Sequence, residues 1–429
     1  MFQHILIFLL IIGPTIQYRI ELGAFSVTLA EPIILLASLI LIVDQIRRRG
    51  SVFLARTPIV GLLLLMCFWA LIVRPLDGNL TRGLSDARDW IIPTLGFLAL
   101  ISTVKTNWRR WSALVVGGVV IQSLLGIYQH LSDSARPFVN ALSSYKTGFT
   151  LVEGGESLEL VSFAVGLFVH PNGFAIYLFG GLMLLISWPV TGKQRFAKYA
   201  LVALIGVCLF WTYAKASLLV MGVAIVWYGL QSQLRSGAQL LALTGIGVLV
   251  GSLALLALLP FLPAAILSTF YWRLGLWETG LWQIGAYPET LLVGNGMDYF
   301  GQIAYHAQPH NVYVFMTLEY GLFGLVWTLT LMLVIVWQGW SARRRGLFQR
   351  EPMLAGLWIY LIGFAAVGLV ESNLQTLNDR GVFLLFYACF LGLLRDQRLH
   401  VAEHVSERVV QDERATIARP GAVGSLPGA

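Results

Sequence analysis

Apolar stretches separated by short polar segments recur along almost the whole chain. A transmembrane helix needs about 20 mostly apolar residues to cross about 30 Å of hydrocarbon. The predicted spans lie at about 3–17, 26–44, 58–75, 90–104, 111–130, 171–190, 198–214, 215–231, 238–260, 311–339, 352–371 and 381–395. Because several spans are short, we expect some helices to be tilted, broken or re-entrant. The pattern predicts an all-α, polytopic membrane protein of about twelve transmembrane helices.

Two polar segments, at about 131–170 and 261–310, are much longer than the others. Both follow an odd-numbered span, so they lie on the same side of the membrane. Long loops on a compact domain often carry substrate chemistry. The tryptophans of the second loop predict a helix at the membrane interface. We expect residues 1–398 to form one membrane domain and the polar segment 399–429 to be a disordered cytoplasmic tail.

Charge gives this arrangement an orientation. The chain is 57% hydrophobic and 12% charged, against about 25% charged residues in a soluble protein. With the N-terminus inside, the inner loops hold fifteen Lys and Arg, the segment from Arg395 to Arg419 adds five, and the longer outer segments hold nine. The positive-inside rule therefore places both termini in the cytoplasm. This topology accounts for the net charge of +7, and we expect no binding of nucleic acid.

Metal-binding and redox patterns are missing from the sequence. Cys67, Cys208 and Cys389 each fall in an apolar span, without disulfide or metal-ligand spacing. No H-E-x-x-H or D-x-D string and no paired Cys/His spacing occurs. We therefore expect neither a metal site nor a cofactor.

The second long loop concentrates residues that could bind a phosphorylated sugar. Arg273 and Trp277 lie one helical turn apart and share a helix face. An arginine beside the membrane can hold a phosphate through its planar guanidinium. His310 stands where a span begins, and a helix N-terminus favours the neutral ring, which can accept a proton from a hydroxyl. Asn311 could cap that helix or hold a sugar hydroxyl.

Each of these residues also has a simpler alternative role. Arg273 could anchor lipid headgroups, and His310 could itself cap the helix. Trp277 could belong to an interfacial aromatic belt. Arg88 is flanked by Asp86 and Asp89 and could pair with them, or it could join Arg273 in an outward-facing cavity.

The residues from 310 to 324 form a recognisable motif. His310-Asn311, nine further residues, and then Gly321-x-x-Gly324 have the form H-N-x9-G-x-x-G. This string resembles the signature of the O-antigen ligase and O-antigen polymerase superfamily. The resemblance covers about 165–395. It is supported by Arg273 with Trp277, by the glycine turn 294–296 with Phe300, and by His170-Pro171-Asn172 at the start of the sixth span.

The resemblance implies a metal-independent, inverting glycosyltransferase of the bacterial inner membrane. Its partners would be membrane lipids, an oligosaccharide donor on undecaprenyl diphosphate at the outer face, and a glycan or lipid-linked acceptor. Arg273 matches the essential loop arginine of the family, and His310 matches its essential histidine. Lys215 replaces a second family arginine and carries the charge without the bidentate geometry. The other expected substrate-binding residues are Arg88, Asn311, His170, Asn172 and Trp277.

The exact reaction stays open at this point. His170-Pro171-Asn172 looks more like the members that polymerise lipid-linked repeat units of O-antigen or exopolysaccharide, so we expect a polymerase. The alternative within the family is a ligase that transfers glycan to lipid A-core. A flippase or secondary transporter is the alternative of another class, with Glu31 and Glu319 as candidate coupling charges. If His310 takes no part, Glu278 or Asp298 becomes the candidate base.

Overall fold

The computed structural model describes residues 2–16, 19–22, 25–49, 57–72, 80–104, 107–132, 152–153, 156–157, 164–168, 170–231, 239, 264–286, 291–295 and 309–417. The helices in these ranges are α1 Phe2–Ile12, the 3₁₀ turn η1 Gly13–Thr15, α2 Ala30–Arg49, α3 Pro58–Ile72, α4 Leu80–Thr103, α5 Trp108–Leu131, α7 Pro171–Ser187, α8 Gln194–Trp211, α9 Lys215–Gln231, α11 Ala264–Ala286, α13 Val312–Arg344, α14 Leu347–Arg350, α15 Pro352–Val367 and α16 Leu377–Ile417. The strands form two antiparallel pairs, β1 Arg19–Leu22 with β2 Phe25–Thr28 and β3 Val152–Glu153 with β4 Glu156–Ser157.

Each predicted span that the structure describes contains a helix, although the span at 26–44 begins within strand β2 and the span at 352–371 ends four residues beyond α15. Among the described helices, α5, α8, α13 and the first part of α16 are long and apolar enough to cross a membrane. The shorter helices α1, α3, α7, α9 and α15 are also apolar. The span predicted at 238–260 lies outside the described residues apart from position 239. The all-α prediction is confirmed, and the long apolar helices indicate a membrane protein.

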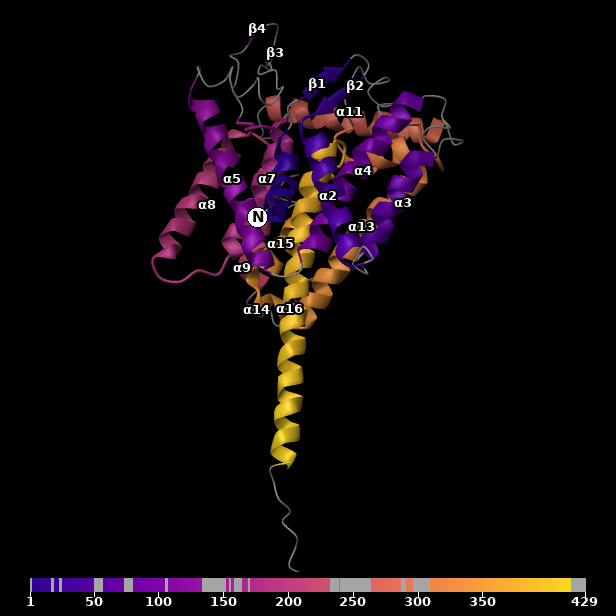
Figure 1. Cartoon of the computed structure of the whole chain (residues 1–429). Coiled ribbons are helices and arrows are strands. Elements are labelled where there is room, and N and C mark those ends of the chain that lie inside the picture. The colour runs from indigo at the N-terminus through magenta and orange to yellow at the C-terminus, as the bar shows by residue number, and fades with distance from the viewer. Residues whose placement is uncertain are drawn as a thin grey trace, which may run out of the picture.

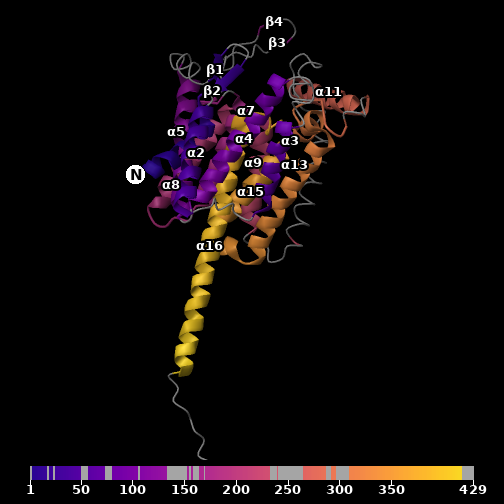
Figure 2. The ribbon, with the colours of Figure 1, turned by 45° about the vertical axis from the view of Figure 1, so that its right-hand side comes forward.

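Helix α16 forms the centre of the bundle (Figures 1 and 2). In its apolar stretch 94% of the residues are buried, against 39% in the corresponding stretches of α5 and α13. It packs against α4, α15 and α5. The outer helices instead expose large apolar side chains, such as Phe210 on α8 and Leu333 on α13. Helices that are apolar on all sides, with some faces left uncovered, are typical of a protein surrounded by lipid.

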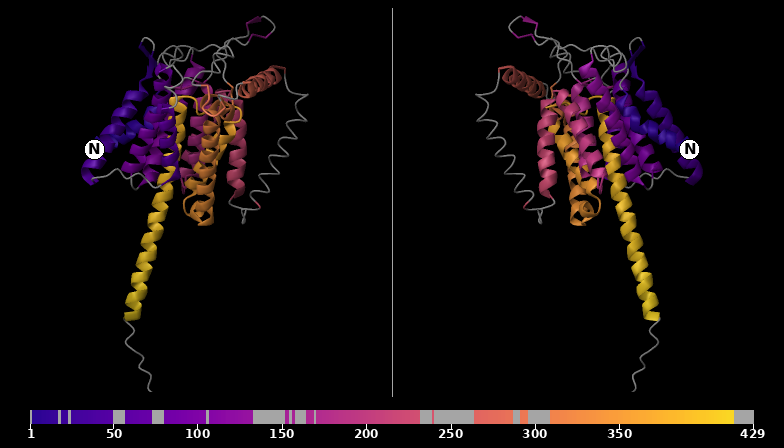
Figure 3. Two further views of the ribbon diagram at one scale, coloured as in Figure 1. Left: turned by 90° about the vertical axis from the view of Figure 1, so that its right-hand side faces the viewer. Right: turned by 90° about the vertical axis from the view of Figure 1, so that its left-hand side faces the viewer.

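The two ends of the bundle differ in what covers them. At one end α11 runs across the helix tips, and the hairpin β1–β2 lies at the same end of the bundle (Figures 1 and 3). From the other end α16 projects far beyond its neighbours, and α13 ends there with Arg343 and Arg344 in its last turn. We call these the α11 end and the α16-tail end. The predicted orientation places the α11 end outside.

Helix α13 is interrupted at Gly321, one of the two glycines of the H-N-x9-G-x-x-G string. Gly321 has φ 68° and ψ −161°, a conformation open essentially to glycine alone. The turn 291–295 docks on this break. At the break, the Leu322 N–H donates to the Leu291 carbonyl at 2.6 Å, and the Leu318 carbonyl accepts from the Asn295 N–H at 2.8 Å. A Cβ on Gly294 would lie 2.4 Å from a backbone oxygen of α13, so both glycines are needed for this close approach.

Two segments differ from the prediction. The first residues of the span predicted at 26–44 belong instead to a β-hairpin, in which Arg19 pairs with Thr28 and Leu22 with Phe25, and the helix begins at Ala30. Polar and apolar residues alternate there, a pattern of period two that suits strands. The tail predicted to be disordered at 399–429 is helical as far as Ile417, because no glycine or proline interrupts the chain between Leu393 and Arg419. Residues 418–429 lie outside the described part.

Candidate functional site

Helix α11 brings Arg273 against the segment that follows α15. It packs on α13 through a small cluster of buried residues formed by Leu276, Val314 and Leu318. Arg273 lies three residues before Leu276, so both side chains lie on the face that contacts the bundle. From this position the guanidinium reaches Glu371, a residue 98 positions further along the chain.

Glu371 joins the two residues that the sequence selects as catalytic. Arg273 Nη2 donates to Glu371 Oε1 at 2.7 Å, and Nη1 donates to the Val370 carbonyl at 2.7 Å. His310 Nδ1 lies 3.0 Å from Glu371 Oε2. The Glu371 side chain is 8% exposed, whereas those of Arg273 and His310 are each 22% exposed. We call Arg273, His310 and Glu371 the outer cluster, in which a buried carboxylate holds two side chains that keep an accessible edge.

The backbone around His310 is fixed by its neighbours. The side-chain oxygen of Asn311 accepts two backbone N–H groups of the first turn of α13, at 2.9 and 3.1 Å, and Asn311 Nδ2 donates to the Leu369 carbonyl at 2.9 Å. The cap of α13 is therefore Asn311, and the alternative in which His310 is the cap is wrong. His310 has φ 45°, which is uncommon for a residue other than glycine and recurs at functional sites.

The ionisation of Glu371 determines which nitrogen of His310 carries the proton. Helix α15 ends at Val367, so Glu371 lies beyond the apolar helix. Burial raises the pKa of Glu371, but the hydrogen bond from His310 and the charge of Arg273 outweigh it, and the pKa lies below its ordinary value. An ionised carboxylate can only accept hydrogen bonds. Nδ1 of His310 is therefore the donor, and in the neutral form of the ring Nε2 is the nitrogen that can accept a proton from another group.

His170 approaches the same cluster from α7. Its Nδ1 accepts the N–H of Asn172 at 3.1 Å and caps α7. The residue keeps an exposed edge, yet the protein packed around the ring lowers the pKa of His170. The charges of His310 and Arg273 also lower this pKa, while that of Glu371 opposes them. A neutral His170 can bind a polar ligand without adding a positive charge.

Lys215 lies at the same end of the bundle as the outer cluster. It is the first residue of α9 and is exposed. Further along α9, Val220 packs beside Gly363 of α15, about one turn before that helix ends. The start of α9 and the end of α15 therefore lie at one level. No described contact joins Lys215 to Arg273, so their convergence on one ligand stays a prediction.

Three further predicted residues belong to the second long loop. Trp277 is half-buried on α11, and its Nε1 has no hydrogen-bond partner among the described residues. Glu278 is exposed on the same helix. Asp298 lies outside the described residues. Trp272 contacts the outer cluster instead, since its ring centroid lies 5.5 Å from that of His310.

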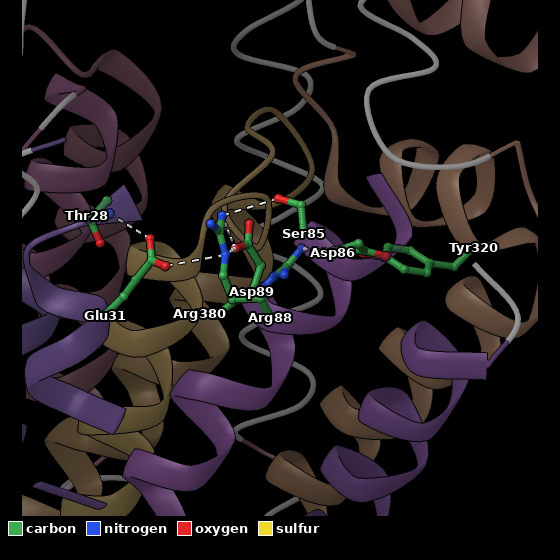
Figure 4. Close-up of polar contacts among 8 residues, drawn as sticks. All are labelled: Thr28, Glu31, Ser85, Asp86, Arg88, Asp89, Tyr320 and Arg380. Atoms are coloured by element: carbon green, nitrogen blue, oxygen red, sulfur yellow. Dashed lines mark hydrogen bonds and ion pairs between the residues drawn. The ribbon is translucent and has the colours of Figure 1, made fainter. Parts of the chain in front are cut away.

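Arg88 belongs to a different group of charges (Figure 4). Its Nε lies 3.3 Å from Glu31 Oε2, and its Nη2 lies 3.0 Å from Asp89 Oδ1 and 3.2 Å from the Ser85 hydroxyl. Glu31 also accepts the backbone N–H of Thr28 at 2.7 Å. For Asp89, these contacts bear out the alternative in which Arg88 pairs with a flanking aspartate, and they add Glu31. Its described partners Glu31, Ser85 and Asp89 all lie outside the outer cluster.

Deeper in the bundle lies a polar network that sequence reasoning missed (Figure 4). Tyr320 donates to Asp86 and accepts from Trp90 Nε1 at 2.9 Å. Arg380 is 1% exposed, and its guanidinium lies 4.0 Å from the centroid of the Trp90 ring. Its Nε donates to the Leu374 carbonyl at 2.8 Å, and its Nη2 lies 3.9 Å from Asp86 Oδ1. We call Asp86, Trp90, Tyr320 and Arg380 the inner network.

An apolar hollow of about 590 Å³ lies beside the break in α13. Its walls come from α3, α13 and the turn 291–295, and they include Trp69, Leu292, Phe323 and Trp327. Phe323 stacks on Trp69 with 4.0 Å between the ring centroids. A hollow with walls of this kind suits a hydrocarbon chain.

Glu371 is the residue of the outer cluster that sequence reasoning missed. The sequence gives one indication of its role, because a lone carboxylate at the end of an apolar span requires a partner.

The described residues contain no group of three or more His, Cys, Asp or Glu that could hold a metal ion. Comparison of the chain with protein-family models and with curated proteins finds no match.

Proposed function

We propose that this protein is an inverting glycosyltransferase that acts on lipid-linked glycan at the α11 end of the bundle. The observation that carries the proposal is the outer cluster, in which Glu371 holds His310 and Arg273 side by side at a partly exposed site. A base oriented by a carboxylate and a cation beside it are what transfer from a sugar diphosphate requires. The resemblance of residues 310–324 to the O-antigen ligase and polymerase superfamily supports the same reaction.

In the proposed reaction, His310 accepts a proton from the acceptor hydroxyl. The hydroxyl oxygen forms a bond to the anomeric carbon of the donor sugar. The bond from that carbon to the diphosphate oxygen breaks, and its electron pair leaves with the lipid diphosphate. The proton passes to Nε2 of His310, and the Glu371 carboxylate stabilises the imidazolium through Nδ1–H.

Arg273 stabilises the charge that the diphosphate gains. A guanidinium has five N–H donors, and two of its nitrogens here use one donor each on Val370 and Glu371. Nη1 and Nη2 each keep one further N–H on a side chain that is 22% exposed, whereas Nε is buried and has no hydrogen-bond partner among the described residues. Arg273 thus keeps hydrogen-bonding capacity for a phosphate, although its geometry is already set by Glu371. Lys215 would add a second positive charge at the same end of the bundle.

The apolar hollow beside the break in α13 is the proposed site for part of the lipid chain of the donor. It is bounded by the turn 291–295, which follows α11, so α11 connects it with the arginine of the outer cluster. The donor would then place its diphosphate at Arg273 and its hydrocarbon along α13. We propose that the chain lies in a bacterial inner membrane with both termini in the cytoplasm, as the distribution of Lys and Arg indicates.

Polymerisation of lipid-linked repeat units is the favoured form of the reaction, and ligation to lipid A-core is the alternative. Both use the same donor and the same catalytic residues. Transport is less well supported, because the candidate coupling charges have partners inside the protein. Glu31 pairs with Arg88, and Glu319 acts electrostatically on Arg380.

The experiment is to incubate the purified protein with a defined undecaprenyl-diphosphate oligosaccharide without any ion gradient. We expect glycan transfer and release of the lipid diphosphate. A ladder of lengthening lipid-linked products would indicate a polymerase, and a single transfer to lipid A-core would indicate a ligase. Movement of intact lipid-linked glycan across vesicles, without any new glycosidic bond, would contradict the proposal.

A further inference from the structure

A second cavity, of about 260 Å³, lies at the α16-tail end and is separate from the outer cluster. It is lined by residues at the start of α3, the last turns of α13 and the region of α16 where that helix leaves the bundle. Pro58 and Trp337 form part of its apolar wall, and Gln338, Arg395 and Arg398 form part of its polar wall. The cavity is therefore amphipathic, with positive charge on one side.

The two arginines of this cavity have different environments. Arg395 donates through Nη1 to the Ile101 carbonyl at 3.2 Å and through Nη2 to the Val104 carbonyl. These bonds fix it at the C-terminal end of α4, where cations are favourable. Arg398 lies three residues further on the same face of α16 and is exposed. Within the described ranges Arg398 forms no ion pair or hydrogen bond, so its charge is available to a ligand.

The apolar side of the cavity continues onto a face of α13 that the protein leaves uncovered. Trp337 is 61% exposed, and the preceding Val336 and Leu333 are 43% and 68% exposed. These positions follow helical spacing and lead from the cavity toward the middle of the bundle. Exposed tryptophan at the end of an apolar helix face is typical of the membrane interface.

We propose that this cavity binds the headgroup of an anionic phospholipid from the leaflet around the α16-tail end. Arg398 would pair with the phosphate, and Arg395 would keep its wall of the cavity in place and add a second positive charge. The acyl chains would lie along Leu333 and Val336. A soluble anion would use the arginines but not the uncovered apolar face, so the arrangement favours a lipid. Basic pockets between helices on the cytoplasmic side are typical of such sites.

The test measures lipid binding to the purified full-length protein by native mass spectrometry and by the shift of its Tm. Phosphatidylglycerol is compared with phosphatidylcholine of the same acyl chains and with inorganic phosphate. We expect phosphatidylglycerol to be retained and to raise the Tm, and the other two to have little effect. Equal effects of phosphatidylcholine or of inorganic phosphate would overturn the proposal.

Variants locate the site. Arg398→Gln should weaken binding of phosphatidylglycerol about fivefold, the contribution expected of one arginine at an anionic surface. Arg398→Lys keeps the charge and should retain most of the binding. Arg110→Gln is the matched control, since Arg110 is exposed near the start of α5 at the same end but lies outside the cavity. Equal weakening by Arg110→Gln, or none by Arg398→Gln, would contradict the assignment. Neither residue belongs to the outer cluster, so this test is independent of the proposed glycosyl transfer.

Discussion

The outer cluster and the inner network contain the same kinds of residue in opposite settings. Each has an arginine, a carboxylate and an aromatic ring, drawn from segments far apart in the sequence. In the outer cluster the arginine and the histidine are each 22% exposed. In the inner network Arg380 is 1% exposed, and it lies against the Trp90 ring and next to Asp86.

The difference in exposure separates a cluster that can bind a substrate from a network that stabilises the fold. Taking charges out of water is costly, so a fully buried pair persists when its partners compensate it closely. In the inner network Arg380 is compensated by Asp86, the Leu374 carbonyl and the Trp90 ring, and the network ties α4, α13 and α16 together beside the break at Gly321. The outer cluster keeps unused hydrogen-bonding capacity at a surface, which is what binding a substrate requires.

The largest expected effect is on turnover, from Arg273→Ala. Loss of a preorganised cation at a developing negative charge costs about 100-fold to 1,000-fold in rate. The turnover of Arg273→Lys should lie between that of Arg273→Ala and that of the wild type, because lysine keeps the charge but loses the planar geometry. The measurement is turnover on a lipid-linked donor beside the Tm in detergent. Full activity of Arg273→Ala would rule out its role at the diphosphate.

The inner network should respond in stability. Arg380→Met leaves Asp86 buried without its arginine, and breaking a buried pair costs about 3–5 kcal/mol. Replacing both residues, with Asp86→Asn added, should recover part of this loss. Denaturant or thermal unfolding in detergent provides the measurement. If the single variant unfolds like the wild type, Arg380 does not stabilise the fold in the way described.

A smaller effect is expected where α13 breaks. In Gly321→Ala a Cβ would lie 2.4 Å from backbone atoms of Leu292, at a φ of 68°. Forcing a side chain into such a conformation costs about 1–3 kcal/mol. Gly275→Ala is the control, because its Cβ would meet no atom within 4 Å. The docking of the turn 291–295 would be unimportant if both variants had the same Tm.

The smallest expected effect is a pH dependence of stability from Glu371. Its pKa is lower in the folded protein than the ordinary value of 4.5. The carboxylate therefore stabilises the fold above that value, and this contribution is lost as the pH falls through the folded pKa. Glu371→Gln should remove the corresponding slope below pH 4.5. Identical pH profiles for the variant and the wild type would show that Glu371 has no net stabilising role.

The comparison also shows what the sequence could and could not predict. The apolar helices were predictable because each one depends on a local run of residues. Arg273 and His310 were selected by residue type and by the motif, and the structure places both at one carboxylate. Glu371 was not predictable as their partner, because it lies 98 residues from Arg273 and a local pattern does not report pairing at that distance.

The inner network was missed for a related reason. Tyr320 and Asp86 are 234 residues apart, and each lies in a helix whose hydropathy gives no indication of a partner. The sequence did raise the ion pair of Arg88 with its flanking aspartates as an alternative, because Asp89 is its neighbour. It did not predict that Glu31 completes that pair. Contacts between adjacent residues were thus accessible to sequence reasoning, and contacts between helices were not.

The most direct test of the account is the turnover of His310→Ala on a lipid-linked donor, measured beside its Tm in detergent. Asn311, and not His310, caps α13, and Glu371 keeps its bond to Arg273, so the variant should fold with a Tm lowered only by the loss of the His310–Glu371 hydrogen bond. Loss of a general base costs about 100-fold or more in rate. The account therefore predicts a folded protein with turnover reduced by at least that factor. A folded His310→Ala protein with near-normal turnover would contradict it.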